Sequence, residues 1–419
     1  MKYKAQRGTQ DVLPSAAYRW QNLERTFSEL VQRYGYQEIR TPLFEDTELF
    51  VRSSGETSDI VSKQMYTFLD KGGRSLTLKP EGTAPAMRAV IENNLCPPGS
   101  VQRLYYITPI FRYERPQKGR YRQAHQVGLE LIGSPSPMAD AEIIEITVRF
   151  YELLGIRNVQ VLLNSLGRAE CRARYREAVL SHARPFLKSQ PEEIRAKAEK
   201  NPLRLLDSKD PEVQEALKGC PPVTDYLEDE SKRRFDELQR LLDDAKVCYA
   251  VSPDIVRGLD YYTETVFEVQ STSLGAQSAL CGGGRYDGLI AELGGPPTPS
   301  VGVAMGIERA LMVQEAEGVE VGEPRLGVFV VSAGPSAAKS VRALTSYLRD
   351  NGISALQDYD GRSMKSQLKL ADKSGARFAA IIGDEELASD TVTLRDMASS
   401  VQRSLMRNEI VSELKRCLS

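Results

Sequence analysis

The segment 112–122, with the sequence RYERPQKGRYR, carries the densest charge in this chain. It holds five positive charges, one negative charge and two tyrosines. The planar guanidinium of arginine matches phosphate oxygens and aromatic rings can stack on bases, so these residue types suit a clamp for a nucleotide or an RNA strand. A hairpin tip that only faces solvent would have the same composition, since surface loops are commonly charged. Both interpretations stand on these residues alone.

A second polar cluster, LKPEGTA at 78–84, ends a strand-like run just before a predicted helix. Its glycine lets the backbone turn, and Glu81 and Thr83 offer oxygen acceptors for the ammonium group of a ligand. The same residues also fit an ordinary helix start with Thr83 near the N-cap. The segment is therefore a candidate binding site with a structural alternative.

Two glycine-bearing segments surround a predicted strand, VRGLDYYT at 256–263 before it and GGGRYDG at 282–288 after it. Three consecutive glycines destabilise a strand unless a ligand or another backbone approaches closely. They do not form the dinucleotide-binding pattern G-x-G-x-x-G, because Asp287 stands where that pattern requires glycine. A Rossmann-type site is therefore disfavoured.

A fourth segment, VGVAMGIER at 301–309, leads into a helix that carries Arg309. An arginine buried there needs an anionic partner, and a ligand phosphate is one candidate. The neighbourhood of Glu308 and the solvent are the alternatives.

Composition excludes several classes of protein. The chain has 419 residues, of which 41% are hydrophobic and 27% charged, and at ~150 residues per domain this predicts two or three folded domains. Only His125 and His182 are present and no two cysteines form a C-x-x-C pair, so we expect no protein-ligated metal. The net charge is −2, which means that any affinity for nucleic acid must be local.

The chain shows no apolar run of the ~18 residues that a membrane-spanning helix requires. Residues 1–15 contain Asp11 and no apolar signal-peptide core. We therefore expect a cytoplasmic protein without membrane partners.

Hydrophobic periodicity predicts an α/β fold, of the α+β kind, in which antiparallel strands dominate the first part of the chain. An amphipathic helix is expected after Pro14 and a short strand at 37–42, where Pro42 suits a strand end, an edge or an interface. Hairpins are expected from the paired runs 65–69 with 74–78 and 103–113 with 123–132.

The composition and the hydrophobic pattern change twice in the second half of the chain. Residues 168–245 are charged, helical in pattern and punctuated by prolines. They are followed by predicted strands at 247–251, 265–270 and 276–281 and by a predicted buried helix at 301–314. Beyond a linker at 318–324, a β-α-α-β pattern predicts a separate α/β domain from elements at 328–331, 336–350, 362–374 and 379–382.

Together and in this order, these segments resemble those of the histidyl-tRNA synthetases, which are class II aminoacyl-tRNA synthetases. The strand bearing Pro42 is similar to the first class motif, residues 111–114 with the following loop and strand to the second, and residues 302–309 to the third. The more specific resemblance lies in RGLDYY at 257–262 and GGRYDG at 283–288, which are similar to the two histidine signatures of that family. The resemblance covers nearly the whole chain.

The resemblance implies a class II fold, in which an antiparallel β-sheet catalytic core is flanked by helices. The implied organisation is a first part of the core at 1–167, a helical insertion at 168–245, a second part of the core at 246–320 and an anticodon-binding domain at 325–419. It also implies a homodimer formed through the first motif. The implied activity joins L-histidine to ATP as histidyl-adenylate, releases pyrophosphate, and transfers histidine to the 3′ end of tRNA(His).

The same resemblance implies roles for individual residues. The catalytic residues would be Arg112 and Arg257, which bind the α-phosphate, with Arg257 also holding the histidine carboxylate. Histidine would be bound by a group that contacts its ammonium, its imidazole or the surrounding wall: Glu81, Thr83, Gln126, Glu130, Arg257, Tyr261, Tyr262 and Tyr286. ATP, with Mg²⁺ bridging its β and γ oxygens, would be bound by Arg112, Glu114, Arg120 and Arg309. Transfer RNA would be contacted by Gln117, Lys118, Arg122, Arg362, Lys365 and Lys369.

The last three of these residues belong to a basic stripe along one predicted helix. Arg362, Lys365, Lys369, Lys373 and Arg377 recur at spacings of three and four, and the buried side of the helix is expected to be formed by Met364, Leu368 and Ala371. A solvated helix face is the alternative.

Two positions depart from the family pattern. Ala124 stands where the family usually has a phenylalanine that packs on adenine, so one stacking surface is missing. Lys79 replaces a usual arginine, which is a milder change. The neighbouring His125 is open to two interpretations, a base for the transfer step or a hydrogen-bonded structural histidine.

Two other functions compete with the enzyme. A catalytically inactive, synthetase-like subunit could sense histidine or tRNA, but such relatives typically lose the signature arginine or the C-terminal domain, and this chain keeps both. A single-stranded RNA-binding module would explain the basic loop and leave Glu81, Glu130 and Tyr262 without a purpose.

Overall fold

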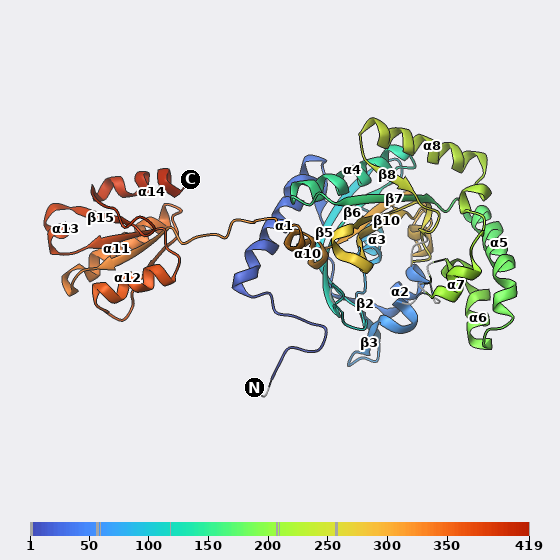
Figure 1. Cartoon of the computed structure of the whole chain (residues 1–419), viewed down its shortest axis with the longest axis horizontal. Helices are drawn as coiled ribbons and strands as arrows, with labels where there is room; N and C mark the ends of the chain where they lie inside the picture. Colours follow the sequence, from blue (N-terminus) through green and yellow to red (C-terminus); the bar gives the residue numbers. More distant parts are fainter. Residues whose placement is uncertain are drawn as a thin grey trace. The chain divides into compact units, whose positions relative to one another are not determined.

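The computed structural model describes residues 3–55, 58, 60–117, 119–206, 208, 210–255 and 259–418. They form two compact units, Met1–Val321 and Gly322–Ser419, each with its own large sheet (Figure 1). In the described part of the chain, no helix combines the length and the apolar character needed to cross a bilayer.

The first unit is built on an eight-stranded sheet. Its order is β1-β5-β6-β11-β10-β9-β7-β8, and every neighbouring pair is antiparallel except the two at its edges, β1 with β5 and β7 with β8. The strands are β1 (Gln37–Glu38), β5 (Gln102–Phe111), β6 (Gln123–Ile132), β7 (Val159–Ser165), β8 (Tyr249–Val251), β9 (Thr263–Ser271), β10 (Ala279–Arg285) and β11 (Ser300–Gly306). This sheet confirms the prediction of a mixed α/β fold with an antiparallel core.

A second, three-stranded antiparallel sheet of order β2-β4-β3 lies in the same unit. Its strands are β2 (Phe44–Asp46), β3 (Tyr66–Leu69) and β4 (Ser75–Leu78). The hairpin β3–β4 turns at Gly73, which adopts φ +78°, a conformation that glycine reaches at no steric cost.

Helices of the first unit connect and cover these strands. They are α1 (Pro14–Arg33), α2 (Thr47–Ser54), α3 (Thr83–Glu92), α4 (Pro137–Leu153), α5 (Ala169–Leu187), α6 (Glu192–Lys200), α7 (Pro211–Ala216), α8 (Asp229–Asp244), α9 (Leu289–Glu292) and α10 (Ile307–Ala316). Shorter helical turns are η1 (Ile60–Gln64), η2 (Pro202–Leu205), η3 (Val223–Tyr226) and η4 (Thr272–Gln277).

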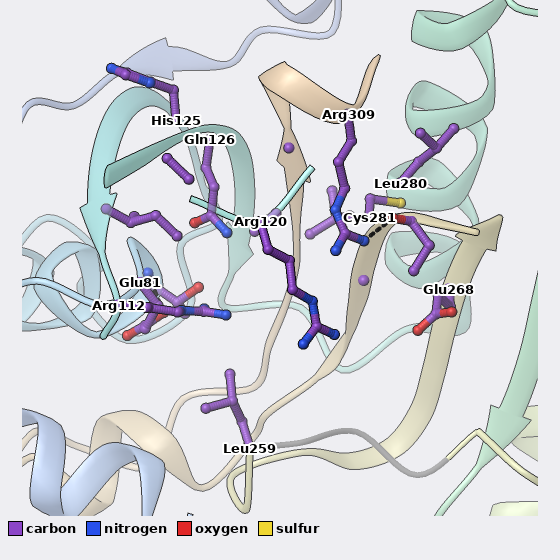
Figure 2. Close-up of a pocket in the computed structure, with 18 of the residues that line it drawn as sticks. Glu81, Arg112, Arg120, His125, Gln126, Leu259, Glu268, Leu280, Cys281 and Arg309 are labelled. Carbon is purple, nitrogen blue, oxygen red and sulfur yellow. Dashed lines mark hydrogen bonds between the residues drawn. The ribbon is translucent and has the colours of Figure 1, made fainter. Parts of the chain in front are cut away.

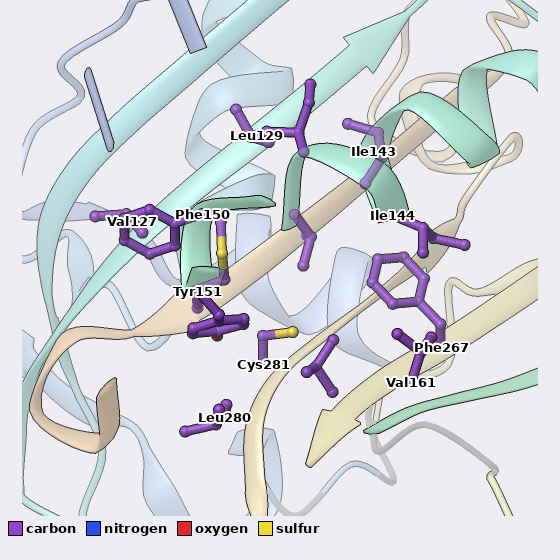
Figure 3. Close-up of a cluster of buried hydrophobic side chains, with 14 of the residues drawn as sticks. Val127, Leu129, Ile143, Ile144, Phe150, Tyr151, Val161, Phe267, Leu280 and Cys281 are labelled. Carbon is purple, nitrogen blue, oxygen red and sulfur yellow. The ribbon is translucent and has the colours of Figure 1, made fainter. Parts of the chain in front are cut away.

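The main hydrophobic core lies on one face of the eight-stranded sheet. Phe27 of α1, Phe150 of α4, Leu238 of α8 and Val313 of α10 are buried there against the strands, and Figure 3 shows the part of this core around Phe150. Their amphipathic periodicity explains the packing, because each helix turns one apolar stripe towards the sheet. The opposite face of the sheet carries a smaller cluster with α3 and α9, and this face holds the cavity described below.

Residues 301–306 form a strand, so the prediction of one buried helix over 301–314 is wrong for its first half. β11 ends at Gly306 and α10 begins at Ile307. Val301, Val303 and Met305 enter the main core, and the small residues Gly302 and Ala304 alternate with them. A strand buried on both faces reads as a continuous apolar run, which is hard to distinguish from a buried helix by hydrophobicity alone.

Two other strands differ from their predicted bounds. The strand expected at 37–42 is β1, which covers Gln37–Glu38 and does not reach Pro42. The strand expected at 276–281 is β10, and it contains the three glycines Gly282, Gly283 and Gly284 rather than ending before them. These glycines lie in the middle of the sheet, and a Cβ on Gly283 or on Gly284 would fall 2.5 Å from the carbonyl oxygen of Gly302 or of Thr265, respectively.

The segment between β7 and β8 is mostly helical. Its first part, α5 to η3, has two small hydrophobic clusters of its own, around Tyr175 and Ala183. By contrast, α8 packs on α4 and contributes Phe235, Leu238 and Leu242 to the main core. This helix is therefore integrated with the sheet.

The second unit is a five-stranded sheet of order β13-β12-β14-β15-β16 with helices on both faces. Its elements are β12 (Val328–Ser332), η5 (Pro335–Ala337), α11 (Ala338–Asp350), β13 (Ala355–Gln357), α12 (Met364–Lys373), β14 (Phe378–Ile382), α13 (Asp384–Ser389), β15 (Thr391–Asp396), β16 (Gln402–Met406), η6 (Arg407–Glu409) and α14 (Ile410–Leu418). The four predicted elements are present, and β13 adds a strand between the two predicted helices.

The buried side of α12 differs from the predicted one. Met364 is 38% exposed, whereas Gln367 is 2% exposed and Ala371 is fully buried. Gln367 can be buried because its amide bonds the backbone of Ser332 and the carbonyl of Arg362.

A buried ion pair joins β10 to α4. The guanidinium of Arg285 is fully buried, and its Nε lies 3.2 Å from both carboxylate oxygens of Asp140. Further bonds run to Asp287 and to the carbonyls of Ser134 and Ser136. Every bonding direction of this arginine is used inside the protein, which makes it a structural residue.

We predict that Asp140→Ala lowers the free energy of unfolding of the first unit by about 3–5 kcal/mol, because the buried guanidinium of Arg285 loses its buried anionic partner and keeps only the partly exposed Asp287. Urea unfolding followed by the fluorescence of Trp20, the single tryptophan of the chain, measures this change. The control is Arg149→Ala on the same helix, which removes an exposed pair with Glu152 and should change stability by less than about 1 kcal/mol. Equal effects would contradict the structural role of Asp140.

Candidate active site

A cavity of about 310 Å³ lies over strands β6, β11 and β10 of the large sheet. Figure 2 shows side chains from several elements directed into it, with Glu81 and Arg112 on one side and Arg309 on another. Most residues that the sequence assigned to histidine or ATP line this cavity: Glu81, Thr83, Arg112, Glu114, Arg120, Gln126, Tyr261, Tyr262, Tyr286 and Arg309. Segments more than 200 residues apart in the sequence therefore meet at one site.

The remaining predicted residues lie elsewhere. Glu130 is fully buried behind the cavity wall, and Gln117 and Arg122 belong to the loop beside the cavity without lining it. Arg257 and Lys118 fall outside the described residues.

Three arginines, Arg112, Arg120 and Arg309, bring positive charge into the cavity. Arg112 donates from Nε to the carbonyl of Pro80 at 2.7 Å, and Arg309 donates from Nε to the carbonyl of Gly119 at 3.2 Å and from Nη1 to that of Ala279. Burial, followed by the nearby positive charge of Arg120, lowers the pKa of Arg309. Like charges held together in a partly buried site favour an anionic ligand.

Acidic groups accompany these arginines. Glu114 lies 3.5 Å from Arg120, and Glu268 of β9 lines the same cavity. Glu268 was missed from the sequence because it belongs to an ordinary strand pattern. Glu308 does not pair with Arg309, as one sequence interpretation allowed, but with His125.

Glu81 caps the N-terminus of α3. Its two carboxylate oxygens accept from the backbone N–H groups of Thr83 and Ala84, each at 2.7 Å. Burial raises the pKa of Glu81, while these two bonds and the charge of Arg112 oppose the rise. The cap thus comes from Glu81 rather than from Thr83, and it holds this carboxyl group at the edge of the cavity.

Gln126 offers an acceptor for a ligand. Its Oε1 is buried and, among the described residues, has no hydrogen-bond partner, although the side chain lines the cavity beside Glu81 (Figure 2). Buried polar atoms are normally satisfied, so an unpartnered amide oxygen in a cavity wall indicates a place for a donor such as an ammonium group.

Glu130 is held by two tyrosine hydroxyls. Tyr106 donates to its Oε1 at 3.1 Å and Tyr286 donates to its Oε2. Burial raises the pKa of Glu130 to about 8, against the opposing effect of these bonds. The carboxyl of Glu130 is therefore mainly protonated at pH 7. It does not line the cavity itself, but Tyr286, which donates to it, does.

Missing side chains make room for this arrangement. Gly302 lies opposite Glu130 across the β11–β6 pair, and a Cβ there would fall 1.9 Å from Glu130 Oε2. Tyr106 lies opposite Gly128, and a Cβ on Gly128 or Gly82 would fall within 2.4 Å of its ring. The sequence did not point to Tyr106, because only the strand register shows that its ring fills the space beside Gly128.

Tyr261 and Tyr262 complete the wall on the far side. Both are almost fully buried, their ring centroids lie 4.7 Å apart, and the Tyr261 ring lies 5.6 Å from that of Tyr286. Three aromatic rings thus surround a compact part of the cavity next to Glu130, a setting suited to a flat ring.

His125 is engaged with protein groups. Its Nδ1 lies 2.9 Å from Glu308 Oε1, its backbone N–H donates to the same carboxylate, and its ring makes an edge contact with Trp20. These contacts favour the structural interpretation of this histidine over the catalytic one.

In the basic loop beside the cavity, the backbones of Gln117 and Arg120 form an isolated antiparallel β-bridge. Arg122 lies 4.0 Å above the ring of Tyr113 and donates to the carbonyl of Glu114 at 3.3 Å. The loop therefore presents a stacked arginine and tyrosine at its surface.

In the second unit, Lys365 and Lys369 line an open groove together with Arg395 and Met397. Arg362 is not part of that groove, because it is paired with Asp358 and Asp360. The predicted basic stripe along one helix is wrong at both ends, because α12 covers Met364–Lys373 and therefore includes neither Arg362 nor Arg377.

No group of three or more histidine, cysteine, aspartate or glutamate side chains within the described ranges is arranged to hold a metal. Any cation at this site would therefore depend on its ligand as well as on protein carboxylates.

Comparison with known proteins gives consistent matches over the length of the chain. Residues 8–310 match the family model described as histidyl-tRNA synthetase, and residues 327–416 match that of an anticodon binding domain. A histidine–tRNA ligase of Desulfitobacterium hafniense is 48% identical over 97% of this chain and 96% of the relative. That of Caldanaerobacter subterraneus subsp. tengcongensis is 46% identical over 99% of this chain and the whole relative.

A solved structure agrees with these matches. The crystal structure of apo S. aureus histidyl-tRNA synthetase is 37% identical and superimposes with a TM-score of 0.84, covering 99% of this chain and 100% of the other. The class II fold that the resemblance implied is thereby confirmed. The chain belongs to the histidyl-tRNA synthetase family.

Proposed function

We propose that this chain is a histidine–tRNA ligase that activates L-histidine with ATP and transfers it to tRNA(His). The observation that carries the proposal is the cavity itself, which brings the carboxyl group of Glu81 and the tyrosines around Glu130 together with the guanidinium groups of Arg112, Arg120 and Arg309. The ammonium group of an amino acid and the phosphates of a nucleotide would find complementary groups side by side. The full-length similarity to curated histidine–tRNA ligases supports the same activity.

In the first step, the carboxylate of histidine attacks the α-phosphorus of ATP and pyrophosphate leaves. Negative charge builds on the oxygens of the α-phosphate, and we assign its stabilisation to Arg112 and to Arg257, which also holds the histidine carboxylate. Arg112 is already fixed by its bond to Pro80, so it need not reorganise during the reaction. Arg120 and Arg309 take the outer phosphates.

Histidine is oriented by groups at both of its ends. Glu81, Thr83 and the unpartnered oxygen of Gln126 receive the α-ammonium, and Glu130 and Tyr262 read the imidazole nitrogens between the rings of Tyr261 and Tyr286. An analogue without those nitrogens leaves buried polar groups unpaired, which strongly disfavours its binding.

We also propose that Mg²⁺ binds together with ATP in this cavity. Glu114 and Glu268 place carboxylates in the cavity that the arginines line, and carboxylate together with phosphate oxygen is the donor set that Mg²⁺ prefers. Bound there with ATP, the ion would neutralise charge on the β- and γ-phosphates.

Transfer RNA would be engaged by both units. We assign the acceptor end to Gln117, Lys118 and Arg122 of the loop beside the cavity, and the anticodon to the groove of Lys365 and Lys369. Arg362 contributes less, since two aspartates already neutralise it. For the transfer step, a phosphate oxygen of the adenylate is the better base, because Nδ1 of His125 already bonds Glu308.

A homodimer is supported by exposed apolar side chains around the first motif. Leu43, Phe44, Phe68 and Leu69 of the three-stranded sheet region are all more than 40% exposed, and β1 forms an edge of the eight-stranded sheet. Exposed apolar patches and open strand edges are typical of protein interfaces. We place the enzyme in the cytoplasm, where tRNA is charged for translation.

The regulatory alternative is disfavoured. A sensor without catalysis has no need for the outer-phosphate arginines, and this chain keeps Arg309 in place with two backbone contacts. The curated relatives are themselves named as ligases.

We predict histidine-dependent exchange of pyrophosphate into ATP by the purified chain. Arg257→Ala should reduce the exchange rate by about 10²–10³-fold, since it removes a fixed charge from the reacting phosphate. Thermal unfolding of the variant should remain close to that of the wild type. Wild-type protein without histidine-dependent exchange would refute the proposed function, whereas full activity of the variant would refute the role of Arg257 alone.

We predict a pH dependence of histidine binding that Glu130 controls. The pKa of the imidazole of free histidine is about 6.5 and the pKa of Glu130 is about 8. Between these pH values the carboxyl of Glu130 carries the proton that the bound pair needs and the imidazole is neutral. Binding therefore neither takes up nor releases a proton in this range. Above pH 8 the complex must take up a proton, and KM for histidine should rise. Glu130→Gln should raise this KM about 10–100-fold at pH 7 and remove the rise, leaving KM for ATP nearly unchanged. An unaltered alkaline limb in the variant would contradict the assignment.

We predict that Gly302→Ala abolishes most histidine activation, because its Cβ would displace Glu130 Oε2 from a distance of 1.9 Å. The control is Gly306→Ala on the same strand, whose Cβ would meet Arg309 at an ordinary 3.7 Å. We expect KM for histidine to rise at least about tenfold in the first variant and much less in the second. Similar values for both would show that the room beside Glu130 is not required.

A further inference from the structure

The chain that forms one wall of the histidine pocket is held from outside by the helical segment between β7 and β8. Arg172, in the first turn of α5, donates from Nη1 to the carbonyl of Tyr262 at 2.7 Å and to that of Asp260 at 3.3 Å. Arg172 is half-buried, and burial lowers its pKa. A desolvated guanidinium that bonds two carbonyls of one short stretch fixes that stretch firmly.

The side chain of Asp260 makes a second contact with the same helical segment. Its Oδ1 accepts from Asn201 Nδ2 at 3.2 Å and lies 3.7 Å from Arg204 Nη2. Asn201 is 5% exposed and directly precedes η2, which carries Arg204. Two separate parts of the segment, the start of α5 and η2, thus converge on residues 260–262.

Asp260 also touches the first part of the chain. Gly55, which follows α2, adopts φ +79°, and a Cβ there would fall 2.4 Å from Asp260 Oδ2. The carboxylate therefore lies in a narrow space between the end of α2 and the helical segment. Residues 260–262 cannot shift outward without breaking contacts on both sides.

These contacts matter because the residues they hold face the cavity. Tyr261 and Tyr262 line it with their rings, while the carbonyl of Tyr262 is the one that Arg172 binds. The backbone is held from the side of the helical segment, and the two residues line the cavity. A small backbone movement would shift both rings relative to Tyr286 and Glu130.

We propose that Arg172, Asn201 and Arg204 of the helical segment are positioning residues, which set the Asp260–Tyr262 backbone so that Tyr261 and Tyr262 close the histidine pocket. The three residues touch no substrate. Their effect is on histidine and much less on ATP, because the arginines of the cavity are fixed by other contacts, such as that between Arg112 and Pro80. This inference rests on the proposed function, and it makes the helical segment a determinant of histidine affinity.

Arg172→Ala tests the proposal. In histidine-dependent pyrophosphate exchange we expect KM for histidine to rise about tenfold, the effect of losing one charge-assisted bond, with KM for ATP changed less than about twofold. Arg172→Lys should recover part of the loss, since it retains a cationic donor. The matched control is Arg174→Ala on the same helix, whose guanidinium instead bonds the carbonyl of Tyr226 within the segment.

Asn201→Ala, Asp260→Ala and the double variant test the second contact. Removing either partner breaks the same interaction, so the double variant should lose little more than the worse single variant. Arg204→Ala, at the partly exposed rim, should give a smaller rise in KM for histidine and keeps the test available if Arg172→Ala does not fold. Thermal unfolding of each variant identifies losses that come from instability.

The outcomes separate this inference from the proposed function. A wild-type chain inactive with histidine would refute the function itself. An active wild type in which Arg172→Ala matches Arg174→Ala, or in which KM for histidine and ATP rise equally, would overturn the positioning role alone. Additive losses in the Asn201 and Asp260 pair would overturn the second contact.

Discussion

The site depends on a constraint of space, the absence of side chains at Gly82, Gly128 and Gly302. Their positions let the ring of Tyr106 and the carboxyl of Glu130 occupy volume that any Cβ would take. Burial in this space raises the pKa of Glu130 to about 8, although the hydroxyl groups of Tyr106 and Tyr286 donate to its carboxyl and oppose the rise. A hydrogen-bonded carboxyl behind a wall of aromatic rings can distinguish flat ligands by the hydrogen-bonding atoms at their edges, which is why we propose that it recognises imidazole.

One face of the large sheet carries the main hydrophobic core, and the other face carries the cavity. On one face, large apolar residues such as Val303 and Met305 pack against helices; on the other, small residues of the same strand leave room for the cavity. Because β11 is fixed from behind by a close-packed core, the positions of Gly302 and Arg309 are fixed as well. The buried pair of Arg285 and Asp140 locks β10 to α4 in the same way.

Carboxylates and guanidinium groups are interleaved around the cavity. Glu81 lies near Arg112 and Glu114 lies near Arg120, and Arg309 and Glu268 line the same cavity. The protein bears the cost of keeping three guanidinium groups together, and an anionic ligand relieves it. The helical segment adds a further layer, since it holds the backbone of Tyr261 and Tyr262 from outside the pocket.

The sequence by itself determined the family, the mixed α/β class and most cavity residues, because short motifs such as RGLDYY and GGRYDG carry chemistry in their order. It failed at residues 301–306, where a strand buried on both faces reads like a helix, and at Met364, which is exposed in place of Gln367. Only the tertiary structure places Tyr106 and Glu268 at the site and brings Arg172 to the backbone of residues 260–262. Strand register and packing bring them to the site from distant segments, and no local pattern encodes which residues will lie opposite one another.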